Sequence, residues 1–346
     1  MQAVAPFPRA PTLQGVIVKD NTTPAFPLQW QPLVDQAASA LRELAINEEA
    51  KGRFLTDPLL RPFMQRVSQR YVAGSTVHDV IVRAAMINQS GHRASAEYMG
   101  ESVRDEAFAM AETDVFMQLV HAIGDQRLDC SISFDLSHIG SLVDPELGYR
   151  NARDIARAAS AIGKEVMISM EASDRADGIY DIYSRLHDED GLANVGITVP
   201  AKLHRTASDL ALLLRHPGRI RLVKGAFFES ADVAFARNSP ELASAYRRYA
   251  AQLLRSGHKC SIATHDRAIQ DELAAMIRSE GIPAGQFEFE SLIGLGEKNI
   301  ADLRDAGFAT REYAVFGKDY FLYVLNRISE EPIRVYQAVV DALGRP

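Results

Sequence analysis

The stretch from Arg311 to Glu330, REYAVFGKDYFLYVLNRISE, combines charged and aromatic side chains at spacings that could serve chemistry. Its pattern predicts a short strand that ends at Phe316, a turn at Gly317 and then a helix. Four side chains share one side of that helix because they are three or four residues apart: Tyr323, Asn326, Arg327 and Glu330. Such a helix can lay an Arg and a Tyr over the mouth of a barrel and bind a small anion. An ordinary ion pair on a surface helix explains the same residues, so the choice depends on the rest of the chain.

A second group of charged residues ends an apolar run in Arg221-Leu-Val-Lys224-Gly225-Ala226. Alternation along a strand sends Arg221 and Val223 to one face, and the following turn brings Lys224 to the rim. Gly225 lets the backbone approach a ligand closely. Two cations beside such a glycine suit a phosphate-bearing or electron-accepting cofactor.

Two further strand-like runs end in polar residues. Ala263-Thr264-His265-Asp266 offers a hydroxyl, an imidazole and a carboxylate together. A metal site there is disfavoured because no second His or Cys stands at a ligand spacing, and a structural histidine is an equal alternative. In Phe287-Glu288-Phe289-Glu290 a carboxylate must point into the protein, which is costly unless a partner neutralises it. A structural salt bridge is the simplest explanation of these carboxylates.

Short runs rich in apolar and β-branched residues recur eight times: Arg93–Met99, Cys130–Leu136, Glu165–Met170, Asn194–Val199, Arg219–Val223, Cys260–Thr264, Gln286–Ser291 and Arg311–Phe316. Amphipathic stretches of helical length separate them, including Asp105–Ile123, Asn151–Ala161, Ala207–Leu214, Pro240–Leu254 and Ala268–Ser279. Strands that alternate with helices predict a parallel sheet, and eight of them predict a closed (β/α)8 TIM-type barrel with its working residues at the C-terminal strand ends. A doubly wound open sheet is the competing fold, but no Gly-x-Gly-x-x-Gly motif follows an early strand.

The region before the barrel has a different character. The first thirty residues are rich in proline and irregular, and the helical pattern from Leu33 to about Tyr71 is interrupted by Pro58 and Pro62. Another helix is expected at Val77–Ile87. We therefore predict an irregular and helical N-terminal arm over residues 1–75 and a catalytic barrel over residues 76–346.

The composition of the 346 residues, 47% apolar and 24% charged, is typical of a soluble globular protein. The net charge of −7 argues against a nucleic-acid partner. The chain has no apolar run long enough to span a membrane, and its start does not resemble a signal peptide, so we expect a cytoplasmic protein without a transmembrane segment. Cys130 and Cys260 each open an apolar run and are expected to be buried, reduced thiols.

Several motifs, taken together and in order, resemble the proline dehydrogenase family of FAD-dependent enzymes. RLVKGAF, ATHD, FEFESLIGLG and YAVFGKDYFLYVLNRISE correspond to the family's RLVKGAY, ATHN, FEFQ-x-L-x-G, and closing Tyr, Gly and Tyr-x-x-Arg-Arg-x-x-Glu. Upstream, RYVAGSTVHDVIVRAAMINQSGHRASAEYMGES resembles the helix and first strand that end Leu-Gly-Glu, and MEASDRADGIYDIYSRL resembles the segment after the third strand. The resemblance covers about residues 70–331, and its strength lies in the number of motifs in register rather than in any one of them.

This resemblance implies a distorted (β/α)8 barrel that holds FAD non-covalently over the strand ends. Arg221 would lie near the reactive nitrogen of the flavin and stabilise its reduced, anionic form. Tyr313 and Tyr323 would wall the substrate pocket, and Arg327 would pair with a substrate carboxylate. The other residues implied at the cofactor are Lys224, Gly225, Ala226, Thr264, His265 and Glu290.

The family's reaction would be hydride transfer to the flavin from a carbon next to an amine nitrogen, giving an imine. A quinone or another acceptor would then receive the electrons. Glu330 would brace its helix, and Glu101, at the Glu of Leu-Gly-Glu, would gate the pocket by pairing with the first Arg of Arg-Arg. The protein would mainly position the substrate and tune the flavin, and it would need no strong general base if the amine binds unprotonated.

The chain departs from the family at positions that would face the ligands. The first Arg of the Arg-Arg pair is Asn326, the second-strand Lys is Asp135, and the third-strand Asp is Ser169. The remaining departures are Pro200-Ala201-Lys202 for Gln-Ala-Tyr, Asp266 for the Asn of ATHN, and Glu290 for the Gln of FEFQ.

These departures change the charge around a substrate carboxylate from three cations to Asp135, Asn326 and Arg327. Losing one partner of a buried carboxylate costs about 2–5 kcal/mol, so proline in the usual pose is disfavoured. We predict an amine-type substrate that is proline-like, another amino acid or a hydrazine, with Asp135 on an ammonium or other N–H-rich group. A one-residue shift in the register of the second strand, or a decayed site, would explain the same residues.

Three alternatives stay open. The chain could be an ordinary L-proline dehydrogenase that makes 1-pyrroline-5-carboxylate, or a catalytically silent barrel, with or without flavin, used for interaction. It could also be a flavin-free lyase that uses Lys224 as a Schiff base. The sequence does not define the oligomeric state.

Overall fold

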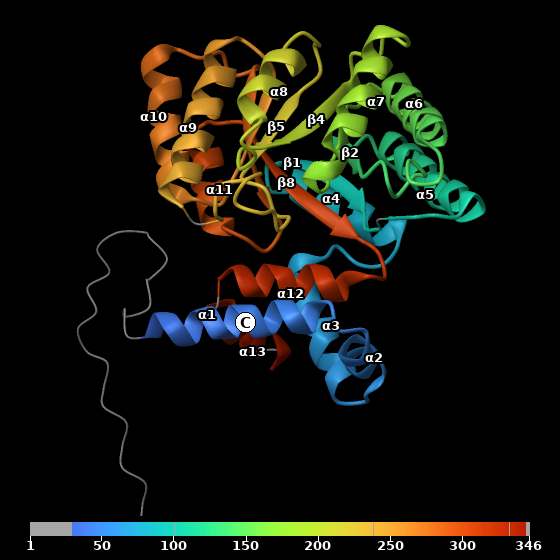
Figure 1. Ribbon diagram of the computed structural model, residues 1–346, viewed down its shortest axis with the longest axis vertical. Helices are drawn as coiled ribbons and strands as arrows, with labels where there is room; N and C mark the ends of the chain where they lie inside the picture. The colour runs from blue at the N-terminus through green and yellow to red at the C-terminus, as the bar shows by residue number, and fades with distance from the viewer. Residues whose placement is uncertain (1–29, 101, 238, 332, 344–346) are drawn as a thin grey trace, which may run out of the picture.

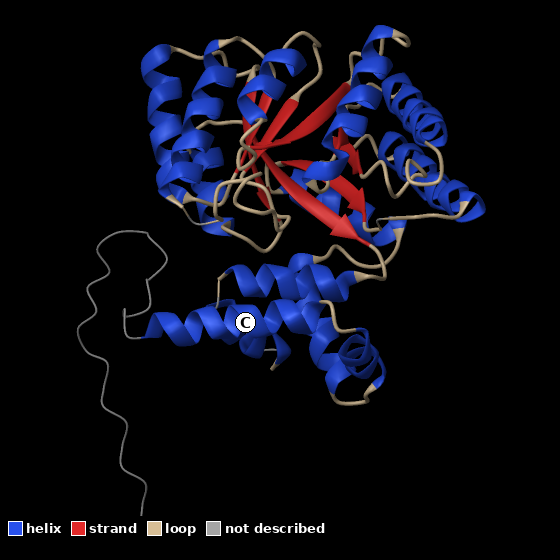
Figure 2. Ribbon diagram, viewed as in Figure 1, coloured by secondary structure: helices blue, strands red, loops and turns tan. Residues whose placement is uncertain are grey.

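The centre of the molecule is a closed barrel of eight parallel strands, which follow one another in chain order (Figures 1 and 2). The structure is a computed structural model that describes residues 30–100, 102–237, 239–331 and 333–343. The strands are β1 (Arg93–Tyr98), β2 (Cys130–Phe134), β3 (Val166–Ile168), β4 (Val195–Pro200), β5 (Ile220–Val223), β6 (Cys260–Ala263), β7 (Phe287–Leu292) and β8 (Thr310–Phe316). Each coincides with one predicted run, with ends that differ by at most two residues. The (β/α)8 prediction is therefore confirmed, and closure between β1 and β8 excludes the open sheet.

Helices surround the barrel and cover the outward faces of its strands (Figure 1). They are α4 (Val77–Gln89), α5 (Glu106–Asp125), α6 (Pro145–Ala161), the 3₁₀ helix η2 (Ser173–Arg175), α7 (Ala176–Asp188), α8 (Thr206–Leu213), α9 (Pro240–Arg255), α10 (Arg267–Glu280) and α11 (Glu297–Asp305). The predicted helices are confirmed. The helices α7 and α11 are not among the stretches named above. Neither helix begins with a residue whose side chain caps it, so the sequence carries no capping signal at these positions.

A second group of helices lies across the C-terminal end of the barrel, and we call it the helical layer. It consists of α1 (Gln31–Ala45), α2 (Glu48–Thr56), α3 (Leu60–Tyr71), α12 (Tyr320–Glu330) and α13 (Ile333–Ala342). In Figure 1, β8 points toward this layer, and α12 lies between the barrel and α1. The predicted helix after Gly317 is confirmed, whereas α13 was not predicted.

The helical layer has its own apolar core, which joins the two ends of the chain. Val67 and Tyr71 of α3 pack in one cluster with Phe321 and Val324 of α12 and Ala338 of α13. The C-terminal helices thus lie against the helices of the predicted arm. The division of the chain at residue 75 stays a prediction, and the irregular segment predicted for the first thirty residues lies almost wholly outside the described residues.

Cys130 and Cys260 are the first residues of β2 and β6, and both are buried free thiols, as expected. Among the described residues, the helices are all too short or too polar to cross a membrane.

Candidate active site

The strand register arranges the inward side chains of the barrel in stacked levels, as in other barrels of this type. The lowest level of the odd-numbered strands holds Glu288, which lies 2.7 Å from Nε of Arg311 and 3.6 Å from Nη1 of Arg219. Burial acts to raise the pKa of Glu288, but the two arginines hold that pKa well below its usual range. This level is a neutralised structural ion cluster, as the salt-bridge explanation predicts.

The level above it contains Arg221 and Glu290. Nε of Arg221 lies 3.0 Å from Oε2 of Glu290, and Nη2 donates to the hydroxyls of Ser95 and Ser133, each at 3.1 Å. The guanidinium also stacks 4.8 Å from the ring centre of Tyr313. Both predicted carboxylates of β7 therefore point into the barrel, and Arg221 is held there by four neighbours.

A carboxylate that sequence reasoning missed occupies the topmost level. Glu97 of β1 accepts a hydrogen bond from Ser169 Oγ at 3.1 Å. Burial raises the pKa of Glu97 to about 7, and the charge of Arg221 only partly offsets this effect. Alternation along Arg93-Ala-Ser95-Ala-Glu97 places these three side chains on one face and would have revealed Glu97.

The side chains of α12 form a wall at the same end of the barrel. Nη2 of Arg327 lies 2.8 Å from Oε1 of Glu330, and its guanidinium stacks 5.3 Å from the ring centre of Tyr323. Glu330 is also bound by Arg237 at 3.0 Å and Arg334 at 3.4 Å. The prediction that Tyr323, Arg327 and Glu330 share one side of a helix is thus confirmed.

The ends of β5 and β6 are joined by an ion pair between Lys224 Nζ and Asp266 Oδ2 at 2.9 Å. Asp266 also caps α10, since its Oδ1 accepts from the backbone N–H of Ile269 at 3.3 Å. Gly225 has a φ of +108°, and a Cβ there would lie 2.5 Å from Cδ of Lys202. Lys202 in turn donates to the carbonyl of Phe227, so the segment after β5 is tied to β4.

The ring of His265 is held by the backbone of β7. Its Nε2 accepts from the N–H of Leu292 at 3.1 Å, and burial lowers the pKa of His265 to about 3. The neighbouring Thr264 is buried, and its carbonyl accepts from Gln270 at 2.7 Å. The imidazole is therefore neutral, with its proton on Nδ1.

The remaining predicted residues have different placements. Asp135 directly follows β2 and is half-buried, Asn326 is half-buried on α12, and Ala226 is exposed after β5. Glu101 lies outside the described residues.

Comparison with known proteins adds an independent observation. A sequence profile described as proline dehydrogenase matches residues 80–331. Proline dehydrogenase 1 of Bacillus subtilis (strain 168) is 31% identical over 265 residues, which cover 77% of this chain and 87% of the relative. The chain belongs to the proline dehydrogenase family. Members of this family are flavin-dependent oxidoreductases that act on CH–NH donors.

Other family members are similar at comparable levels. The proline dehydrogenase of Deinococcus radiodurans is 29% identical to this chain, and the aligned region covers 80% of this chain and 90% of the relative. Among solved structures, proline utilization A from Bdellovibrio bacteriovorus has a TM-score of 0.72 at 18% identity. That match covers 86% of this chain and 36% of the larger protein, and it supports the barrel fold.

The site has the properties that the family's cofactor and a small substrate require. Three buried polar atoms at this end of the barrel have no hydrogen-bond partner within the described part of the chain: Glu290 Oε1, Tyr323 Oη and Arg327 Nε. A buried polar atom without a partner is costly, and a ligand that forms hydrogen bonds with these groups would remove that cost. The residues present therefore fit a family flavin with its substrate.

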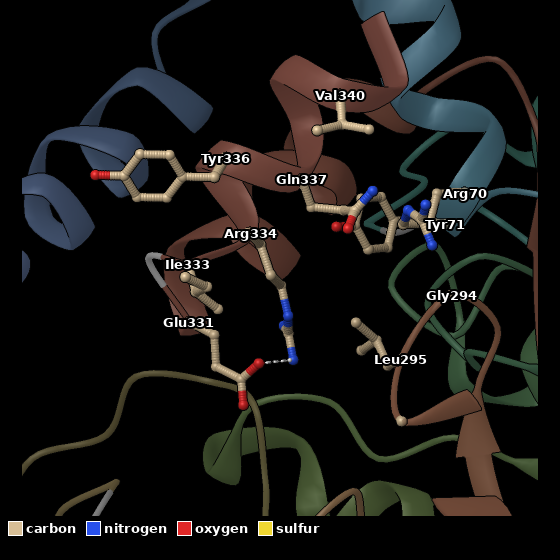
Figure 3. Close-up of a pocket in the computed structure, with 11 residues that line it drawn as sticks. Arg70, Tyr71, Gly294, Leu295, Glu331, Ile333, Arg334, Tyr336, Gln337 and Val340 are labelled. Atoms are coloured by element: carbon tan, nitrogen blue, oxygen red, sulfur yellow. Dashed lines mark ion pairs between the residues drawn. The ribbon is translucent and has the colours of Figure 1, made fainter. Parts of the chain in front are cut away.

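A neighbouring pocket of about 360 Å³ lies between α3, α13 and the loop after β7 (Figure 3). Its two arginines are already engaged, because Arg334 pairs with Glu331 at 2.9 Å and Arg70 pairs with Asp341 at 2.7 Å. Leu295 faces Arg334 across the pocket (Figure 3). Within the described part of the chain, none of the buried polar atoms that lack a hydrogen-bond partner belongs to a residue lining this pocket, so we assign the chemistry to the barrel mouth.

Proposed function

We propose that the protein is an FAD-dependent dehydrogenase that oxidises the C–N bond of an amine-type substrate other than proline. The observation that carries this proposal is the set of partnerless polar atoms at a mouth that combines Arg221 and Arg327 with the acids Glu97 and Asp135. Because Asp135 and Asn326 stand where the family has two cations and Arg327 is the third, the site suits a compound with N–H groups at that end better than it suits the carboxylate of proline.

Each side chain would contribute through its position. Arg327, braced by Glu330, would hold one carboxylate of the substrate, and Tyr323 and Tyr313 would enclose the substrate between them. Asp135 would accept hydrogen bonds from the nitrogen-bearing end, with Asn326 and Ser169 as neutral neighbours. Arg221, fixed by Glu290, would present a positive charge that does not need to reorganise during the reaction.

Lys224, Gly225, Ala226, Thr264 and His265 would hold the cofactor along the ends of β5 and β6. Gly225 supports this role because its positive φ allows close backbone approach. Bound FAD would supply the two-electron acceptor for the hydride, and a quinone or another acceptor would reoxidise it.

The first test is anaerobic bleaching of the purified flavoprotein by L-proline, N-methylglycine, benzylamine and methylhydrazine. We expect a compound other than proline to bleach the flavin fastest. Bleaching by proline at the rates of ordinary family members would instead identify an ordinary proline dehydrogenase. Failure of all amines to bleach the flavin would favour a silent barrel.

A charge reversion tests the role of Asp135 and Asn326 directly. The double variant Asp135→Lys/Asn326→Arg restores the family's cations, and we expect it to raise the proline bleaching rate by at least tenfold, about 1.4 kcal/mol. Asp129→Lys makes the same change of two charge units as Asp135→Lys, but just before the opposite end of β2, and serves as the control for that substitution. Equal rates in the double variant and the control would contradict the assignment.

A further inference from the structure

Glu97 is a buried acid to which neither the family resemblance nor the proposed function gives a part in proton transfer. Glu97 lies one level above Arg221 on the inner face of the barrel. Its exposed fraction is 8%, whereas Ser95, one level below on the same strand, is fully buried. The topmost level of the odd strands, to which Glu97 belongs, also contains Ser169 and Leu292. Asp135 lies at the next level out. Glu97 is therefore at the floor of the candidate site and reachable from its mouth.

The proposed reaction creates a need for such a group. An ammonium nitrogen has no lone pair to support loss of hydride from the neighbouring carbon, so the amine must be neutral when it reacts. Alkyl amines keep their proton near pH 7, as a lysine side chain with a pKa of about 10.4 shows. A proton acceptor inside the site removes this obstacle.

We propose that the Glu97 carboxylate receives the amine proton of the bound substrate. One N–H bond of the substrate ammonium breaks, its electron pair stays on nitrogen, and the proton bonds to Oε1 of Glu97. The products of this step are a neutral amine and a neutral carboxylic acid, and nothing is oxidised or reduced. Ser169 holds the other oxygen, Oε2, and so orients the carboxylate.

The surroundings of Glu97 suit an acceptor that works near neutral pH. Arg221 from β5 favours its charged form, while Glu290 from β7 and Glu171 after β3 disfavour it. On the side of the helical layer, Tyr323 is neutral, because burial raises its pKa to about 12. Other charged and titratable groups at this end are Asp135 after β2, Tyr313 of β8, Arg327 of α12, and Lys224, His265 and Asp266 at the ends of β5 and β6. A carboxyl with a pKa of about 7 in this setting can both take and release a proton under working conditions.

The test measures the limiting rate of anaerobic flavin bleaching against pH, with the fastest of the four amines named above as the probe. In the unaltered protein the rate should rise as pH passes about 7, because only the carboxylate form accepts a proton. Glu97→Gln should lose this ionisation and be at least 100-fold slower at pH 7. Its rate should recover at high pH, where solution deprotonates the amine. Flavin absorbance at full occupancy would show that the variant is folded.

Two further variants separate this role from a structural one. Ser169→Ala removes a hydrogen bond to the charged form of Glu97, so the ionisation should move to higher pH. Glu312→Gln is the matched control, since burial also raises the pKa of Glu312 but its side chain faces outward on β8, and its pH profile should be unchanged.

The outcomes distinguish this inference from the proposed function on which it rests. A Glu97→Gln variant that bleaches with the same pH profile would refute the proton-acceptor role and leave the proposed function intact. If all the amines fail to bleach the unaltered flavoprotein, both are refuted together.

Discussion

Arg221 and Glu290 form an ion pair of 3.0 Å inside the barrel, one level above the cluster around Glu288. The pair differs from that cluster because Oε1 of Glu290 has no partner within the described residues, whereas both oxygens of Glu288 are bound. Both oxygens of the lower carboxylate are thus bound by protein groups, whereas the upper pair leaves one acceptor oxygen available for a ligand.

Glu290→Gln should raise the reduction potential of the bound flavin. The substitution removes a negative charge while keeping an acceptor for Arg221, so a reduced, anionic flavin would be stabilised. We expect a rise of roughly 20–40 mV, since about 30 mV corresponds to 1.4 kcal/mol for two electrons. A dye-coupled reductive titration of the holoprotein measures it. An unchanged or lower potential would show that Glu290 is remote from the flavin.

Arg327→Lys should weaken binding of a substrate carboxylate. Lysine cannot reproduce the planar, bidentate contact of a guanidinium, so we expect KM to rise about 10–100-fold with a smaller change in kcat. The comparison between N-methylglycine, which carries a carboxylate, and benzylamine, which does not, provides an internal control. Equal losses for both compounds would argue against carboxylate recognition.

The attachment of α13 to α3 should depend on pH through Asp341 and Arg70. The hydrogen bond from Arg70 lowers the pKa of Asp341 in the folded protein below the ordinary 3.8. The pair therefore stabilises the fold fully above the unfolded pKa, and this contribution is lost as pH falls through the lower, folded pKa. The protection factors of the α13 amides, which correct for the slower intrinsic exchange at low pH, should be lower at pH 3 than at pH 6. Asp341→Asn should remove most of this difference, and a pH dependence that survives in this variant would point to another group.

Gly225→Ala should destabilise the protein and weaken retention of FAD. The φ of +108° and the clash with the Lys202 side chain predict a loss of about 1–3 kcal/mol. Gly178→Ala is the control, because a Cβ at this α7 position meets no atom within 4 Å and should stabilise the helix by about 0.5–1 kcal/mol. Thermal unfolding and bound-flavin absorbance report both effects. A neutral result at Gly225 would mean that the loop rearranges freely.

The barrel was predictable because short apolar runs and helical periodicity are both local signals, and the two alternate along the chain. The wall on α12 was predictable for the same reason, since residues three and four apart must share a side. Alternation along β1 places Glu97 on the inner face, but its contact with Ser169 of the loop after β3 depends on the closed barrel and has no local signal. The helix α13 was missed because its apolar face is explained only by α3, far away in the chain. The partners of Glu330, namely Arg237 and Arg334, depend on the same long-range packing.

The packing of α12 against α1 and α3 has a consequence for how the protein folds. The helical layer joins segments as distant as Arg70 and Asp341, which are 271 residues apart, whereas each strand pair of the barrel except the closing pair of β1 and β8 joins consecutive strands. Contacts between distant segments carry the largest entropy cost and tend to form late. We therefore expect the barrel to form before α12 is seated. A folding intermediate at that stage would already contain the eight strands, but α12 would not yet cover the end of the barrel where a substrate would bind.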